Sequence, residues 1–393
     1  MTQVERGRSE SYGFETGCPN ILLSTDFPMN ARQSRLGFTL VELLIAIAII
    51  GILMSLTVTA VTRAITRGRE TASRLEINAL SQAIEQYSLK YGDYPPDGSS
   101  EQVLLRHVRK IFPRISAQDL ALLTQLTRVR GSNTFSEVAM DRGEALVFFL
   151  GGFSGNPLNP FTGEGGPLKR IGSDPMNIAS YEYNGTRDNA FYDFDANRLT
   201  VARSAAGVLL STDEKLLGLG SEPRLGGEDQ LPAYLARVGT PTPVIYFDSR
   251  TYGNVAPSTA VPLAFNGYLA GNTEYGGVRP YMTNGNTGGA TYADVKFHND
   301  STFQIISPGS DGVFGACVSV DRSNPSAWPV YFISQTGVAV SPPAPPAPVS
   351  PTPEPAPLIR GFQDMDWSPL VKVAGHLDNV TNFSSSTLES DLK

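Results

Sequence analysis

The sequence predicts an α+β protein in which one long N-terminal helix packs on a head built around an antiparallel β-sheet with long loop insertions. Two patterns carry this prediction. A continuous apolar run at 39–62 passes into a segment with about one apolar residue per helical turn. After residue 153 the chain breaks into short β-favouring runs separated by turn residues. A sheet packed on a helix is the architecture that buries both patterns.

The composition describes a globular, acidic protein. Of 393 residues, 41% are hydrophobic and 18% are charged, and the net charge is -7. This apolar content excludes disorder throughout the chain, and the negative charge argues against a nucleic-acid-binding protein. Two cysteines and three histidines leave almost no material for a zinc centre of the usual kind.

The apolar run at 39–62 is long enough to cross a membrane. Its 24 residues contain a single charge, Glu42, and as a helix they span about 36 Å, against roughly 30 Å of hydrocarbon. The run is longer than the apolar core of a cleaved secretory signal, so we expect residues 38–62 to remain as a membrane-spanning segment. Arginines flank it on both sides, which leaves the positive-inside count ambiguous: Arg32 and Arg35 before it, and Arg63, Arg67 and Arg69 after it.

The residues that open this run, SRLGFTLVELL at 34–44, resemble the prepilin-type cleavage and methylation motif of type IV pilins and type II secretion pseudopilins. In that family a membrane peptidase cuts after the glycine and methylates the new N-terminal phenylalanine. Gly37 matches the cleavage glycine, Phe38 the methylated residue, and Glu42 the glutamate four positions further on. The resemblance implies a leader at 1–37, a cytoplasmic N-terminus, and a periplasmic head on a single pass through a bacterial inner membrane.

Glu42 has two interpretations. A carboxylate within an apolar membrane helix is costly and is a functional hypothesis by default. The family resemblance pairs it with the new amino group of Phe38 on a neighbouring subunit, where it sets the axial step of a filament. The alternative is a glutamate that complements the helix dipole and reaches back to the interface.

The leader is unusual in its charge. Residues 1–37 carry four arginines and four acidic residues, whereas a start at Met29 leaves two arginines and no acid. We therefore expect Met29 to be the true start, or the leader to be long. Removing it takes away Cys18 and leaves Cys317 alone, so that no intrachain disulfide is possible.

The segment 63–91 predicts the amphipathic half of the same helix. Apolar residues recur at helical spacing on one face, and polar residues, Glu76 among them, are expected on the other. The apolar positions are Ile77, Leu80, Ile84, Tyr87 and Tyr91. A helix from Phe38 to Tyr91 is about 81 Å long, and it is expected to end at Gly92, before Pro95 and Pro96.

The sequence YGDYPP at 91–96 resembles the segment that follows the long helix in the major pseudopilin of type II secretion. This resemblance implies the pilin-like lollipop, with a membrane half and a head-packing half of one helix. One departure is the absence of the proline that many pilins carry in the membrane half, where Thr59 stands here.

The head is expected at 92–340, with short helices first and strands later. The strand candidates are 243–250, 294–300, 302–309 and 329–334, and the helix candidates are 103–112, 117–130 and 144–153. Nine of the 17 residues at 341–357 are proline, which predicts an extended linker or loop insertion. The C-terminal segment 358–393 is expected to end in a frayed polar tail.

The loop SPGSDGVFG at 307–315 resembles the start of the calcium site of the major pseudopilin. By that resemblance Asp311 matches the first aspartate, and Asp378, next to Asn379, is the nearest counterpart of the later acidic group. Calcium accepts six to eight oxygen ligands in flexible geometry, so such a site tolerates an insertion between its halves. The alternative is a plain turn in which Asp-Gly supplies a positive φ.

No catalytic motif stands out, and we expect the chain not to be an enzyme. The predicted function is a structural subunit of a pseudopilus or type IV pilus-like filament in protein secretion. The implied partners are further copies of the chain, prepilin peptidase, other pseudopilins, the inner-membrane assembly platform and membrane lipid, and no nucleic acid. Two alternatives are an extracytoplasmic enzyme or binding domain on a signal anchor, and a pilus for adhesion or DNA uptake.

Overall fold

The structure is a computed structural model of the chain. It describes residues 38–128, 134–136, 139–213, 229–237, 240–252, 268–269, 276–284, 295–315, 331–337, 339–340 and 373–392. The chain divides into two compact units, Met1–Thr59 and Ala60–Lys393. The leader, Cys317 and the proline-rich stretch at 341–357 lie outside the described residues, so their predictions stay predictions.

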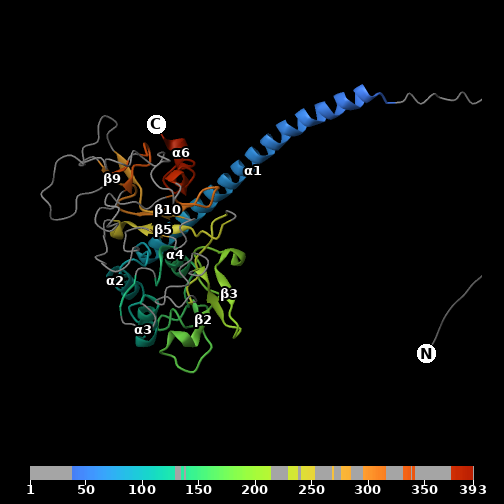
Figure 1. The fold of residues 1–393 in the computed structure, drawn as a ribbon. Helices are drawn as coiled ribbons and strands as arrows, with labels where there is room; N and C mark the ends of the chain where they lie inside the picture. The colour runs from blue at the N-terminus through green and yellow to red at the C-terminus, as the bar shows by residue number, and fades with distance from the viewer. Residues whose placement is uncertain are drawn as a thin grey trace, which may run out of the picture. The chain divides into compact units, whose positions relative to one another are not determined.

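The described helices follow the order expected for the first half of the chain (Figure 1). They are α1 (Leu40–Tyr91), α2 (Glu101–Ile111), α3 (Ala117–Leu126), α4 (Arg142–Leu150) and α6 (Leu388–Asp391), with short 3-10 turns at Ile178–Ser180, Ala196–Arg198, Ser249–Thr251 and Val373–His376. The three helices expected between 103 and 153 are therefore confirmed, each within a few residues of its predicted bounds.

Helix α1 is continuous over 52 residues, as the two adjoining patterns predicted. Its first half is apolar on every side, whereas from Ser73 onward one face is buried in the head. Gly92 ends it with a φ of +68°, and its N–H donates to the carbonyl of Ser88 at 2.7 Å. Glycine reaches this left-handed conformation without the strain of a Cβ, which makes it a frequent helix terminator.

Polar side chains cap the three short helices at their N-termini. Ser100 and Ser116 accept N–H bonds in the first turns of α2 and α3. Asp141 and Glu144 form a reciprocal capping box at α4. Each cap satisfies backbone donors that the helix itself leaves unpaired.

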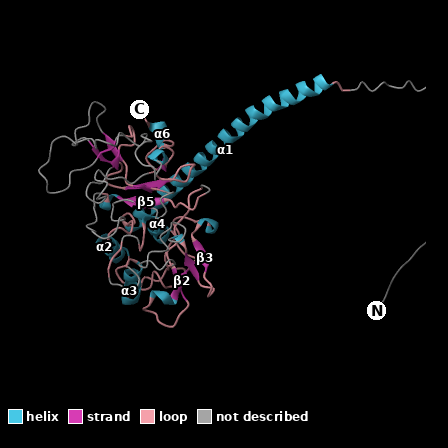
Figure 2. Ribbon diagram, in the orientation of Figure 1, coloured by secondary structure: helices cyan, strands magenta, loops and turns pink. Residues whose placement is uncertain are grey.

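The strands are short and antiparallel in every described strand pair. They are β1 (Leu168–Arg170), β2 (Tyr181–Tyr183), β3 (Val201–Arg203), β4 (Leu209–Ser211), β5 (Ile245–Asp248), β6 (Tyr268–Leu269), β7 (Gly277–Val278), β8 (Met282–Asn284), β9 (Val295–Phe297), β10 (Phe303–Ser307), β11 (Tyr331–Phe332), β12 (Ala339–Val340) and β13 (Val380–Thr381). Antiparallel pairing confirms the expected class, but the strands form several small sheets and not the one sheet that was expected. One three-stranded sheet has the order β13-β10-β5, and the other strands form two-stranded pairs (Figure 2).

The central sheet joins segments far apart in the chain. Phe303 of β10 pairs with Asp248 of β5, and Ile306 pairs with Thr381 of β13 on the opposite edge. The expected frayed C-terminal tail is therefore wrong for the described part of the segment: β13 belongs to this sheet, and Leu388 of α6 is fully buried. Burying that leucine and pairing Val380 fixes the segment despite its polar composition.

One hydrophobic core joins the second half of α1 to the short helices and the central sheet. Its α1 members are the four predicted apolar positions and Ala83, and they pack with residues of α2, α3, α4, β5 and β10. Tyr91, the fifth predicted position, is only half-buried at the edge of this core. The α1 residues of the core are Ile77, Leu80, Ala83, Ile84 and Tyr87. The periodicity prediction is confirmed, and it explains why this half of the helix stays with the head.

Glu76 is the exception on this face. The helical pattern predicted that Glu76 lies on the polar face, but its side chain is buried at 6% exposure. Arg198 pairs with both of its carboxylate oxygens, and the hydroxyl of Tyr234 donates to Oε1 at 3.0 Å. A buried carboxylate is stable only where such partners compensate its lost hydration, and these partners come from a segment more than 120 residues away.

Candidate functional site

The first half of α1 presents an unbroken apolar surface. Phe38 is 75% exposed, and the large apolar side chains from Leu40 to Ile65 are exposed around the whole circumference of the helix. Among the described residues α1 is the one helix long and apolar enough to span a membrane, and none of its most apolar window is buried in the chain itself. An exposed apolar cylinder of this length requires lipid or other helices around it.

Thr39 and Glu42 form a capping box at the start of α1. The Glu42 N–H donates to the Thr39 hydroxyl at 3.2 Å, and the backbone N–H of Thr39 donates to Glu42 Oε2 at 2.9 Å. The Thr39 hydroxyl also donates to Oε2 at 2.9 Å. This reciprocal arrangement satisfies backbone donors of the first turn and fixes the carboxylate at the end of the helix.

The capping box leaves one oxygen of Glu42 available. Both bonds from Thr39 end on Oε2, while a carboxylate offers about four acceptor positions on its two oxygens. Oε1 can therefore accept a bond from an external cation without breaking the cap. The two interpretations of Glu42, helix cap and intersubunit partner, are thus compatible in one geometry.

The structure places the predicted cleavage residues only in part. Gly37 lies outside the described residues, and Phe38 lies just before the first turn, two residues before α1 begins. Thr57 and Thr59, in the membrane half where many pilins carry a proline, direct their hydroxyls to carbonyls three and four residues earlier. These hydrogen bonds satisfy the threonine hydroxyls inside an apolar helix. Helix α1 is continuous through both positions.

The structure brings together the two halves of the predicted calcium site. The backbone N–H of Asp311 and the hydroxyl of Ser310 each donate to Asp378 Oδ2 at 3.1 Å. A Cβ on Gly309 would lie 2.0 Å from the Asp378 carboxyl carbon, so only glycine allows this approach. Residues 67 positions apart thus meet at the edge of the central sheet, next to β10 and β13.

The electrostatics of this pair are unfavourable without a cation. Burial, together with the neighbouring carboxylate of Asp311, raises the pKa of Asp378 to about 6. Asp378 Oδ1 and Asn379 Oδ1 are buried and have no hydrogen-bond partner among the described residues. The carboxylates of Asp311 and Asp378 interact with each other, and carboxylate oxygens are ligands that suit calcium, so these two residues fit such an ion.

A second acidic cluster was not found from the sequence. Candidate ligand atoms of Glu144, Asp213 and Asp229 all lie within 4.8 Å of one another. Each carboxylate already accepts hydrogen bonds: Glu144 from the Asp141 N–H, Asp213 from the Ser211 hydroxyl, and Asp229 from the Leu231 N–H. No local pattern connects three residues spread over 86 positions of chain, so only the fold could reveal the cluster.

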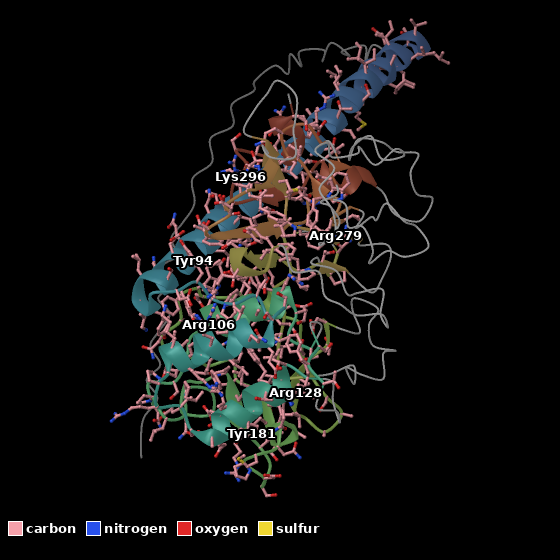
Figure 3. The ribbon with its side chains drawn as sticks, turned by 90° about the vertical axis from the view of Figure 1, so that its left-hand side faces the viewer. Tyr94, Arg106, Arg128, Tyr181, Arg279 and Lys296 are labelled. Carbon is pink, nitrogen blue, oxygen red and sulfur yellow. The ribbon has the colours of Figure 1, made fainter. Side chains whose placement is uncertain are left out.

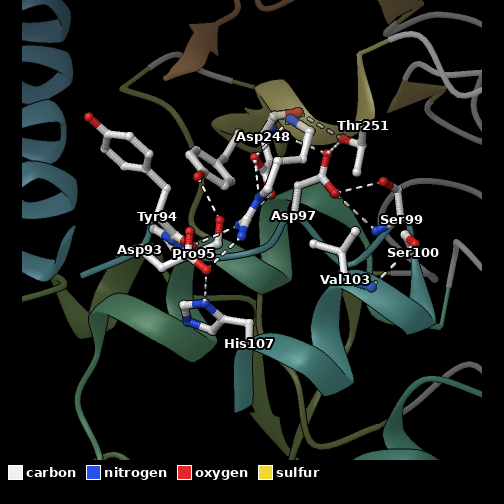
Figure 4. Close-up of polar contacts among 12 residues, drawn as sticks. Asp93, Tyr94, Pro95, Asp97, Ser99, Ser100, Val103, His107, Asp248 and Thr251 are labelled. Atoms are coloured by element: carbon white, nitrogen blue, oxygen red, sulfur yellow. Dashed lines mark hydrogen bonds and ion pairs between the residues drawn. The ribbon is translucent and has the colours of Figure 1, made fainter. Parts of the chain in front are cut away.

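A buried polar network attaches the segment after α1 to the head (Figure 4). His107 of α2 lies between the Tyr87 hydroxyl, 2.7 Å from Nε2, and Asp93, 3.2 Å from Nδ1. Arg250 bridges Asp93 and Asp248 at 2.9 and 2.6 Å. These contacts connect α1 and the residues directly after it with α2 and with the end of β5.

Burial sets the charge state of this network. It lowers the pKa of His107 to about 4, although the hydrogen bond to Asp93 opposes the shift. It raises the pKa of Asp248 to about 6, against the stabilising hydrogen bonds and charge of Arg250. His107 has no exposed surface, so it holds structure and is not placed to act on a substrate.

Comparisons with known proteins agree with the N-terminal site. Residues 32–58 match the family model described as the prokaryotic N-terminal methylation motif. This match supports a type IV pilin-like protein that prepilin peptidase processes, and with the apolar helix it fits a single-pass membrane anchor. Comparisons with curated proteins and with solved structures give no significant match.

Proposed function

We propose that this chain is a structural subunit of a pseudopilus-type filament, processed between Gly37 and Phe38 and assembled through α1, in type II protein secretion. One observation carries the proposal. The methylation motif at 32–58 stands at the start of an uninterrupted 52-residue helix whose first half is apolar and exposed and whose second half is anchored in a head.

The first step is the creation of a new N-terminus. Hydrolysis of the Gly37–Phe38 peptide bond releases the leader and leaves an α-amino group on Phe38, one residue before the capping box. Methylation keeps a positive charge on that nitrogen. On a neighbouring subunit this cation is the partner for Glu42, whose Oε2 is held by Thr39 and whose Oε1 remains as acceptor.

The second step is transfer of α1 from lipid to other helices. In the membrane its apolar half contacts acyl chains, and in a filament the same side chains pack against neighbouring copies. A desolvated pair of Glu42 and the Phe38 amine adds axial register more than net stability, because the cost of desolvation offsets the attraction. Losing either partner is nevertheless costly, because the remaining charge is then buried without compensation.

The proposed topology follows the processing chemistry. The leader faces the cytoplasm, where the peptidase acts, and the head lies in the periplasm. The other partners are further pseudopilins and the inner-membrane assembly platform. Support for type II secretion in particular comes from the YGDYPP segment at 91–96 and the loop at 307–315, both similar to the major pseudopilin.

Calcium is a second part of the proposal. The ion would be held by Asp311 and Asp378, with Asn379 as a candidate further oxygen donor, and it would neutralise carboxylates that otherwise repel each other. It would join the loop after β10 to the segment before β13. We propose no enzymatic activity for the chain.

The competing function is an extracytoplasmic binding or catalytic domain on a signal anchor. The cluster of Glu144, Asp213 and Asp229 is the observation in its favour. In that case α1 is only an anchor, the chain keeps its leader, and Glu42 has no intersubunit role.

Replacing Glu42 by Ala tests the assembly function. We expect a processed, membrane-inserted subunit that no longer enters filaments sheared from cells that overproduce the system. Glu70→Ala is the matched control, since Glu70 lies on the same helix beyond the apolar half and forms no helix cap or ion pair with another described residue. Normal filaments with Glu42→Ala, or equal loss with both variants, would contradict the role of Glu42.

A further inference from the structure

A ring of arginines follows the apolar half of α1 directly. Arg63, Arg67 and Arg69 are all exposed, and none of them makes an ion pair or side-chain hydrogen bond with another described residue. Between residues 60 and 75 there are four arginines against one acidic residue, Glu70, in a chain whose net charge is -7. This is a local concentration of positive charge on an acidic protein.

Their positions along the helix coincide with the lipid headgroups. The apolar run ends at Thr62, and at 1.5 Å per residue Arg63 to Arg69 lie about 1.5 to 10 Å beyond it. Each headgroup layer outside the hydrocarbon is roughly 5–7 Å thick, and an arginine side chain extends several ångströms further. All three guanidinium groups can therefore reach the phosphates of the leaflet on the head side.

Their angular positions cover two opposite sides of the helix. Arg63 and Arg67 are four residues apart and share one face, whereas Arg69 is two residues further on and points to the opposite side. Arg74, the fourth arginine, differs: it is half-buried, and its Nη2 donates to the carbonyl of Ser384 at 3.2 Å. The head thus uses the fourth arginine and leaves the first three to another partner.

We propose that Arg63, Arg67 and Arg69 form a collar that binds the phosphate groups of anionic phospholipids in the leaflet facing the head. The inference rests on the membrane-anchored state in the proposed function. Guanidinium groups bind phosphate oxygens through paired N–H donors, which an ammonium group cannot do in the same geometry.

The proposed topology makes the three arginines unusual for their side of the membrane. With the head in the periplasm, the collar lies on the translocated side, where membrane proteins carry fewer basic residues. Binding to anionic lipid gives these arginines a role that outweighs this bias. The collar holds the unassembled subunit at a fixed depth, and assembly has to replace its lipid contacts.

The test uses the full processed chain, dilute in phosphatidylcholine vesicles with traces of spin-labelled phosphatidylglycerol or phosphatidylcholine. The motionally restricted fraction of each label gives the preference of the protein for the anionic lipid. A basic residue near an anionic surface contributes about 1 kcal/mol, which corresponds to about a fivefold preference per contacting arginine. The preference is expected to fall in about 1 M salt, where the screening length is only about 3 Å.

The test variant is Arg63→Gln/Arg67→Gln/Arg69→Gln, and the matched control is Arg106→Gln/Arg109→Gln/Arg114→Gln. The control arginines are exposed on and just after α2 in the head, where Figure 3 labels Arg106. The collar variant is expected to lose the preference and the control to keep it, with equal total restricted lipid in both.

An unchanged preference in the collar variant, or equal loss in the control, would overturn the collar. A wild type without preference would do the same, as expected if the arginines pair with acidic side chains of neighbouring heads. The absence of any restricted lipid would instead contradict the membrane-spanning helix of the proposed function, so the two failures are distinguishable.

Discussion

At the scale of single residues, the N-terminal site combines two roles in Glu42. The carboxylate completes the capping box with Thr39, which stabilises the start of the helix by satisfying backbone donors of its first turn. It also keeps Oε1 for an external partner. A glutamate at the third helical position thus caps the helix of the isolated subunit, and in the proposed filament its Oε1 is available to the intersubunit partner.

His107 gives a pH-dependent prediction. Its folded pKa of about 4 lies below the ordinary 6.5, so its neutral form contributes stability that is fully present above pH 6.5 and is lost as pH falls toward 4. The shift corresponds to on the order of 3 kcal/mol. Gln keeps hydrogen-bonding groups at this position but does not titrate. In His107→Gln, the free energy of unfolding should therefore lack the part that falls between pH 6.5 and pH 4 because of His107.

The measurement is the difference in unfolding free energy between wild type and His107→Gln from pH 7 to pH 4. The comparison is needed because Asp248, with a raised pKa of about 6, changes stability in the opposite direction over the same interval. Parallel profiles for the two proteins would show that His107 does not titrate with a lowered pKa.

Asp378 gives the calcium prediction. The melting temperature of the full chain should be higher in calcium than in chelator, since a ligand at a hundredfold excess over its Kd adds about 2.7 kcal/mol. Asp378→Asn should remove this difference. Asp300→Asn should leave it, because Asp300 is exposed and its ion pair among the described residues is with Lys296. Identical melting of the wild type with and without calcium would contradict the site.

Among residues, local motifs were predictable and distant partners were not. Gly37, Phe38 and Glu42 are recognisable because the motif is contiguous, and Asp311 and Asp378 were matched by resemblance. Glu76 was predicted on the wrong face, because a charged residue in a helical pattern is expected to be exposed. Its buried charge is compensated by Arg198, which lies 122 residues away in the sequence and could not be found from the local pattern. The Glu144 cluster was missed for the same reason.

At the scale of elements, the second half of α1 is attached to the head by one apolar face, by the buried ion cluster at Glu76 and by hydrogen bonds of Tyr87 and Arg74. The apolar positions from Ile77 to Tyr87 supply the hydrophobic contact, and Glu76 supplies the ionic one. Arg237 lies 3.5 Å from the same carboxylate. This half of the helix is therefore held in a defined register on the head.

Replacing Glu76 by Gln tests this attachment. The change leaves Arg198 largely buried without its carboxylate, and breaking a buried pair costs about 3–5 kcal/mol. Denaturant unfolding of the full chain in detergent measures the loss. Glu70→Gln, on the same helix and half-exposed, should change stability by no more than about 0.5 kcal/mol. Equal stability of the two variants would show that the cluster does not hold the helix.

Helices were easier to predict than strands. The three helices after α1 have apolar periodicity and polar caps within about ten residues, so each is encoded locally. The strands are two to five residues long, and their pairing depends on partners such as β13, which joins β10 across more than 70 residues. The sequence showed β-favouring runs but had no local information on which runs pair or how far the sheet extends.

At the scale of the whole molecule, composition concealed the segment that decides function. An acidic chain with ordinary hydrophobic content contains an apolar, exposed half-helix, in which Glu42 is the one charge, followed by three exposed arginines. With the motif at 32–58, the apolar half-helix fits a single-pass membrane anchor that precedes a head. The fold class could be predicted from the long helical pattern and from the short β-favouring runs that follow it. Which strands pair within the head could be seen only in the structure.

The most direct test of processing and assembly is the mass of the N-terminal peptide from chain extracted from the membranes of cells that contain prepilin peptidase. We expect a chain that begins at Phe38 with a methylated amino group, so that 356 of the 393 residues remain. A membrane-extracted chain that still carries Gly37 joined to Phe38 would contradict processing, and with it assembly through the new N-terminus.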